Sequence, residues 1–188
     1  MVLQRRKMRA ATLAMAVAAI SFVSGCSDSP MVVEPSSSSS SPVLIVQRPA
    51  RGKITAADQW IEGSKLMRND RPDTLRVGND QIGYSYFIAP ANALPQKWVI
   101  VTMRVSTTGP VLVEFGPEGL RFNRPTKVVL SYRGADLSKV NESSLRVYYN
   151  NEKIKAWELM PGGSSDHATM TVRASLEHFS QYAVGSEE

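Results

Sequence analysis

Apolar and polar residues alternate along most of the second half of the chain. Beginning at Ile82, side chains two positions apart repeatedly share the same character, as in Val99, Val101, Met103 and Val105. Four further segments repeat the pattern: residues 111–115, 128–132, 145–149 and 168–172. A period of two is typical of strands with one face in a core and one in solvent. The pattern therefore predicts a series of short, half-buried strands.

Turn-forming residues gather between these segments. Gly, Pro, Asn and Asp cluster at 108–110, 116–119, 133–136, 149–152 and 161–163, and they favour tight turns. No long amphipathic helical pattern interrupts the series. About six to eight short strands with hairpin-length connections predict an all-β fold, an antiparallel β-sandwich, over residues 82–188.

Residues 51–81 fit neither pattern clearly. The segment 57–69, ADQWIEGSKLMRN, allows one or two helical turns, and Pro72, Gly78 and Asn79 then interrupt it. We treat residues 51–81 as a poorly defined segment that leads into the sandwich domain.

The N-terminus has the features of an export signal. Basic residues at positions 5, 6, 7 and 9 precede an apolar run at 10–23 that is too short to cross a membrane comfortably. The run ends in Val23-Ser24-Gly25-Cys26, which resembles a bacterial lipobox; a short buried helix ending in Gly-Cys is the alternative. The resemblance implies that residues 1–25 are a lipoprotein signal peptide and that Cys26 carries acyl chains such as palmitate. Ser27 is not the aspartate that is associated with retention in the inner membrane. The resemblance therefore favours the outer membrane of a cell envelope, with the domain facing either the periplasm or the outside.

Residues 26–50 are predicted to form a linker between the lipid and the domain. They include six consecutive serines at 36–41 and prolines at 30, 35, 42 and 49. Such a composition buries too little apolar surface to offset the chain entropy lost on ordering. We therefore expect a disordered tether, in which the apolar groups 31–33 and 43–46 stay free and do not dock on the domain.

The charge balance argues against a nucleic-acid partner. Four of the 22 Lys and Arg residues lie within 1–25, so 18 remain against 17 Asp and Glu. These charges alternate along the chain, whereas phosphate binding requires a concentrated basic face. Cys26 is the single cysteine, so a lipidated chain keeps no thiol for a disulfide, a nucleophile or a metal.

Four features of the second half of the chain belong together: FGPEGLRFNRPTKVVLSY at 115–132, FIAPANALP at 87–95, Trp157, and ASLEHFSQYAV at 174–184. In this order they resemble the ZU-five domain of zonula occludens proteins, netrin receptors and ankyrins. Ala89 and Asn92 depart from the family's Ile-Pro-x-Gly-Ala-Leu segment. The resemblance, which spans residues 82–184, implies a β-sandwich that binds other proteins as a scaffolding domain.

The tripeptide His178-Phe179-Ser180 raises a second possibility. Some animal members of the family cut themselves between Phe and Ser of such a motif, and here the bond would join Phe179 to Ser180. In that reaction Ser180 Oγ would attack the preceding carbonyl while His178 takes its proton. Cleavage would release only the nine residues 180–188. We therefore favour a closing strand in which Ser180, Tyr182 and Val184 face one side, and Phe179, Gln181 and Ala183 the other.

Other chemistry is sparse in the sequence. The two histidines, His167 beside Asp166 and His178 beside Glu177, occupy opposite ends of one hairpin or of consecutive strands, so neither pair forms a convincing chelate. The aspartates at 70, 73 and 80 do not match the spacing of a calcium loop. No glycine-rich phosphate loop and no Gly-x-Ser-x-Gly elbow is present. We predict no metal and no cofactor.

Aromatic residues offer a weak indication of carbohydrate binding. Flat rings suit sugar rings, but aromatic side chains of a sandwich usually lie in its core. The residues concerned are Trp60, Trp98, Trp157, Tyr84, Tyr86, Tyr148 and Tyr149. We expect Tyr84 and Tyr148 to be the exposed ones.

Three functions remain open at this point. The first is a non-enzymatic, lipid-anchored envelope protein whose sandwich binds another protein or an envelope polymer. The second is an autoproteolytic domain that works through His178 and Ser180. The third is a passive spacer within a larger assembly, which would act through its length alone.

Overall fold

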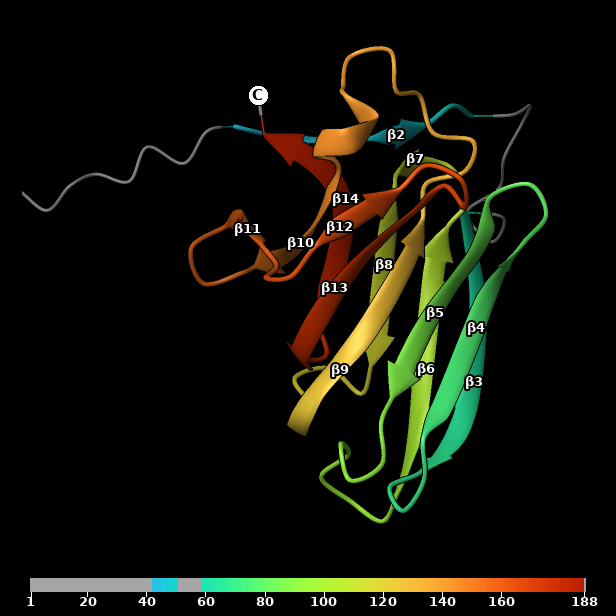
Figure 1. Cartoon of the computed structure of the whole chain (residues 1–188), viewed down its shortest axis with the longest axis vertical. Coiled ribbons are helices and arrows are strands. Elements are labelled where there is room, and N and C mark those ends of the chain that lie inside the picture. The colour runs from blue at the N-terminus through green and yellow to red at the C-terminus, as the bar shows by residue number, and fades with distance from the viewer. Residues whose placement is uncertain (1–41, 51–58, 188) are drawn as a thin grey trace, which may run out of the picture. The chain divides into compact units, whose positions relative to one another are not determined.

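The computed structural model describes residues 42–50 and 59–187, and these residues form an antiparallel β-sandwich. The expected fold class is confirmed. Two sheets pack face to face, and strands β4, β5 and β9 lie in front of β3, β6 and β8 in Figure 1. A short 3-10 turn at Glu142–Ser144, capped by Asn141, interrupts the connection between β9 and β10.

The larger sheet has seven strands in the order β11-β10-β14-β8-β6-β3, with β1 also paired to β14. Their bounds are β1 Val43–Ile45, β3 Trp60–Arg68, β6 Trp98–Ser106, β8 Leu112–Gly116, β10 Arg146–Asn151, β11 Ala156–Leu159 and β14 Gln181–Glu187. β8 pairs with the first half of β14, and β1 pairs with its second half. The first and the last strand of the described chain are therefore hydrogen-bonded to each other.

The smaller sheet has five strands in the order β12-β13-β9-β5-β4. Their bounds are β4 Asp73–Asn79, β5 Gly83–Ala89, β9 Arg121–Ser131, β12 Ser164–Asp166 and β13 Thr171–His178. A separate two-residue pairing joins β2, Gln47–Arg48, to β7, Gly109–Pro110. At the turn from β4 to β5, Gly83 has φ +73, and a Cβ there would lie 2.2 Å from Ser131 Oγ, so only glycine fits.

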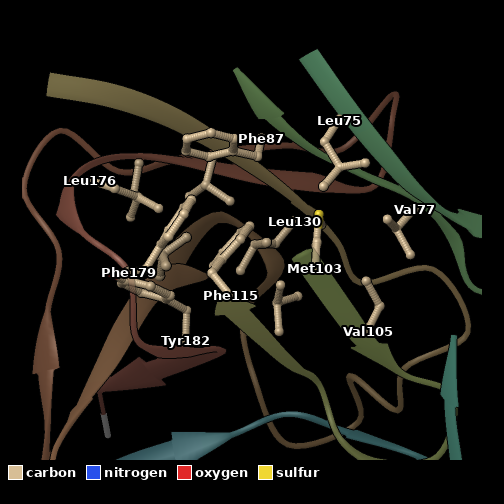
Figure 2. Packing of buried hydrophobic residues seen from close by; sticks show 14 of the residues in the cluster. Leu75, Val77, Phe87, Met103, Val105, Phe115, Leu130, Leu176, Phe179 and Tyr182 are labelled. Atoms are coloured by element: carbon tan, nitrogen blue, oxygen red, sulfur yellow. The ribbon is translucent and has the colours of Figure 1, made fainter. Parts of the chain in front are cut away.

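The core between the sheets follows the alternation in the sequence. Figure 2 shows Met103, Val105, Leu130 and Phe115 pointing into the interior, and all four are buried. The strand predicted at residues 168–172 is only partly confirmed. β13 begins at Thr171, whereas residues 168–170 form an exposed turn with Met170 at φ +52.

Segment 57–69 is a strand over nearly all of the part that the structure describes, and only Gln59 lies in a 3-10 turn. Residues 60–68 form β3, which pairs with β6 over nine positions, and β4 follows it into the other sheet. Two positions on the face of β3 that carries the buried Met67 break the period of two: Gly63, against which Val77 packs closely, and Lys65, which is exposed and bonds Asp73 Oδ1 at 2.5 Å. The boundary predicted at residue 82, between a lead-in segment and the sandwich domain, therefore falls inside the sandwich.

Residues 42–50 also belong to the sandwich, contrary to the expectation that 43–46 stay free. β1 pairs Val43 with Glu187, and Val46 is buried. The signal segment 1–25, Cys26, residues 31–33 and the serines 36–41 lie outside the described residues. Within the described residues, no helix has the length and apolar character needed to span a membrane.

Candidate functional site

The predicted tripeptide lies where β13 passes into β14. Phe179 is 1% exposed, and its ring centroid lies 4.9 to 5.3 Å from those of Phe87, Phe115 and Phe122. Figure 2 shows Phe179 beside Phe87 and Phe115 inside the core. The expected alternation is therefore wrong at this residue: Phe179 precedes β14 and turns inward, as Tyr182 does within β14.

The turn at 116–119 holds the backbone of this tripeptide. The Phe179 N–H donates to the Leu120 carbonyl at 2.8 Å, and the Gly119 N–H donates to the Phe179 carbonyl at 3.1 Å. Gly119 has φ +72, a conformation that favours glycine. Two motifs that lie some sixty positions apart in the sequence are thus joined in one structure.

The Phe179 carbonyl has a second polar neighbour. His178 Nδ1 lies 3.2 Å from this oxygen, so an Nδ1–H would donate to it together with the Gly119 N–H. Two donors on one carbonyl oxygen are what stabilises the negative charge that develops when a nucleophile attacks. This part of the arrangement suits attack on the bond between Phe179 and Ser180.

The nucleophile is placed less well. Ser180 is half-buried and borders two small grooves of about 270 and 300 Å³. No described residue forms a hydrogen bond with Ser180 Oγ, and His178 Nδ1 contacts the carbonyl instead. A proton acceptor for the hydroxyl, which the reaction requires, is therefore not in contact with it in this arrangement.

His178 ends β13, and His167 lies in the turn that precedes this strand. His167 Nδ1 is 3.5 Å from Glu142 Oε2, and the His178 ring packs edge-on against Tyr149. The aspartates at 70 and 73 pair with Arg68 and Lys65. Among residues 42–50 and 59–187, no three His, Cys, Asp or Glu side chains gather as a metal site.

The aromatic residues are distributed differently from the expectation. The sequence predicts that Tyr148 is exposed, but it is 1% exposed, on β10 opposite Ala183 of β14. Trp98 is 43% exposed on the outer face of the larger sheet, with Arg68 stacked 4.7 Å from its ring centroid. Tyr84 is half-buried on the smaller sheet, under the Arg76 guanidinium at 3.4 Å.

A groove of about 660 Å³ lies on the outer face of the five-stranded sheet. Its floor comes from β5 and β9, where Tyr86 pairs with Val129 and Ile88 with Lys127. These outward residues alternate with the buried Phe87 and the other core positions of the same strands. The lining also includes Asp80, Tyr84, Arg133, Thr169, Thr171 and Arg173.

Positive charge dominates this groove. Arg173 is paired with Asp166 at 2.8 Å, whereas no ion pair joins Lys127 or Arg133 to a carboxylate of the described chain. Asp80 is the one acidic residue in the lining. The sequence showed Tyr84 and Tyr86 as candidates but not the cations beside them, because β9 and β13 are brought to β5 by long-range pairing.

Neither the protein-family models nor the curated proteins compared with this chain match it. The resemblance to the ZU-five domain therefore stays a prediction that depends on the motifs in the sequence.

Proposed function

We propose that this protein is a lipid-anchored lipoprotein of the cell envelope whose β-sandwich is a non-catalytic binding module for an envelope polymer or another protein. The observation that carries the binding role is the groove on the five-stranded sheet, which combines Tyr86, Ile88 and Val129 with the unpaired cations Lys127 and Arg133. A lipid at Cys26, followed by the Ser and Pro-rich residues before β1, supports presentation of this groove near a membrane.

The anchor is tested directly by labelling. We expect cells expressing the full chain to incorporate radiolabelled palmitate into it, and a Cys26→Ser variant to incorporate none, because no other thiol exists. Two or more acyl chains bind a bilayer firmly, so wild type should sediment with membranes. An unlabelled chain recovered in the cytosol would refute the lipoprotein assignment.

The binding role is tested by capture from solubilised envelope. The full chain should retain specific envelope material, and the double substitution of Lys127→Gln with Arg133→Gln should release it. A second double substitution, Lys139→Gln with Lys153→Gln, makes the same charge change at exposed positions away from the groove. Equal retention by all three proteins, or none by wild type, would contradict the proposal. A passive spacer would retain no envelope material, and it would lose its function in the cell when residues 27–41 are shortened.

Autoproteolysis is the second candidate, favoured by the two donors on the Phe179 carbonyl. Because no hydrogen bond joins Ser180 Oγ to His178, we expect purified, denatured protein to give one intact mass. The Ser180→Ala control should likewise contain a single uncut species. Denaturation is needed because β14 would hold a cut fragment through its pairing with β8 and β10. A second species that ends at Phe179, absent from the Ser180→Ala sample, would establish self-cleavage.

A further inference from the structure

We propose that the groove on the five-stranded sheet binds an acidic polysaccharide, a chain of sugar rings that carry carboxylates. The inference rests on the proposed function, because it names the class of envelope polymer that the binding module takes. It is carried by the arrangement of cations around an apolar floor.

The cations indicate an anionic ligand. Lys127 and Arg133 are exposed and have no carboxylate partner among the described residues. Arg76 borders the same face, and its stacking on Tyr84 at 3.4 Å fixes a planar guanidinium that can bind a carboxylate through two parallel hydrogen bonds. Asp80 lies at one end, where its Oδ1 accepts a hydrogen bond from Tyr84 at 3.3 Å.

Pairing across the sheet places two arginines at the ends of one row, with Tyr86 and Val129 between them, and Lys127 lies two positions from Val129 on β9. Arg76 on β4 lies opposite Tyr86 on β5, which lies opposite Val129 on β9, and Val129 lies opposite Arg173 on β13. Neighbouring strands are about 4.8 Å apart, so the row extends over roughly 14 Å. Such a length accommodates an oligomeric chain and exceeds what a single small anion would fill.

The apolar floor of the groove indicates a ligand that contains rings rather than a small anion. Tyr86, Ile88 and Val129 are half-buried and adjacent, and they offer an apolar surface to the C–H face of a sugar ring. A carboxylate at the edge of such a ring would then reach the cations at the rim. The ligand therefore needs flat rings with single charges at their edges, as in a polymer of uronic acids.

An acidic peptide fits this face less well. β5 is paired on both sides, with β4 and β9, and β9 is paired with β5 and β13. Their backbone N–H and C=O groups are engaged in the sheet, so a peptide cannot bind here by adding a strand. Side chains alone contact the ligand.

The test is titration calorimetry on the full chain in detergent, with a galacturonate oligosaccharide as the probe. We expect wild type to bind it, with affinity falling as salt is added. Lys127→Gln with Arg133→Gln should weaken binding at least about tenfold, and Tyr86→Ala about threefold to tenfold. The matched pair Lys139→Gln with Lys153→Gln should bind like wild type. Unchanged urea midpoints show that each variant is folded.

Each other outcome overturns the inference. The methyl ester of the same oligosaccharide tests the charge, and equal binding of this neutral probe would exclude a role for carboxylates. Tighter binding of polyglutamate would assign the groove to acidic peptides. Binding that survives both groove substitutions would place the site elsewhere. If no probe binds but envelope capture still depends on Lys127 and Arg133, the ligand class is wrong while the binding module stands; if capture also fails, both are wrong.

Discussion

Replacing Phe179 by alanine is expected to lower the free energy of unfolding by about 3 to 5 kcal/mol. Phe179 is 1% exposed and lies at the centre of an aromatic cluster that joins the two sheets. Phe87 comes from the five-stranded sheet and Phe115 from the seven-stranded sheet, and the Phe115 ring stacks on Phe179 with centroids 5.3 Å apart. Removing the ring leaves a cavity between the sheets that packed neighbours cannot fill without moving.

The measurement is urea unfolding of the full chain, followed by tryptophan fluorescence. Ile100→Ala is the matched control, because Ile100 is 63% exposed on the outer face of the larger sheet and should change stability little. Phe179→Leu should fall between the two, since it refills part of the volume. A Phe179→Ala midpoint equal to that of Ile100→Ala would show that this residue does not join the sheets.

This prediction bears on the meaning of the tripeptide His178-Phe179-Ser180. The structure gives Phe179 a packing role, whereas His178 ends β13, Ser180 lies two positions after it, and both are half-buried. A core role alone accounts for an aromatic residue at this position. Self-cleavage is therefore better tested at Ser180, whose half-buried side chain can lose its hydroxyl without opening the core.

Local pattern was sufficient for much of the fold. The alternation from Val99 to Val105 predicted β6 and its buried face, and the turn at 116–119 was placed correctly. These features depend on residues that are close together in the sequence. The period of two and the turn-forming residues therefore predict them directly.

Long-range pairing was not visible in the same way. The sequence does not predict β3, because Lys65, an exposed charge on the face that carries the buried Met67, meets its partner Asp73 only after the chain has turned into the other sheet. Likewise, nothing near Lys127 or Arg133 in the sequence reveals that Tyr86 lies beside them. The sequence therefore predicts the candidate site only in part, because it indicates the aromatic residues, whereas the cations have the pattern of ordinary surface charges.

Residues 42–50 are the clearest example, since a Ser and Pro-rich composition predicted a tether and the structure shows a packed strap. Arg48 lies within it and is 3% exposed. Its guanidinium donates to the carbonyls of Ser106 at 2.6 Å, Ser131 at 2.7 Å and Arg133 at 3.2 Å. Ser106 ends β6 in the larger sheet and Ser131 ends β9 in the smaller one, so one side chain links the two sheets.

Replacing Arg48 by methionine is therefore expected to lower the free energy of unfolding by about 3 kcal/mol. Burial lowers the pKa of Arg48 to about 10, so the side chain is still cationic at neutral pH and its bonds to the carbonyls are charge-assisted. Hydrogen bonds from a charged group stabilise a fold by about 1.5 to 3 kcal/mol, and buried acceptors left without a donor each cost about 1 to 3 kcal/mol. Methionine keeps most of the volume but donates to none of the three carbonyls.

Urea unfolding of Arg48→Met against Arg71→Met measures this effect, because Arg71 is exposed and the substitution is the same. Arg48→Lys should recover only part of the loss, since an ammonium group cannot span carbonyls of both sheets with the fixed fork of a guanidinium. The strap also carries the Gln47 carbonyl, which accepts from the Asp136 N–H at 2.7 Å, and Val46, whose N–H donates to Val184 at 3.0 Å. Equal stability of Arg48→Met and Arg71→Met would mean that these backbone bonds alone hold residues 42–50 on the sandwich.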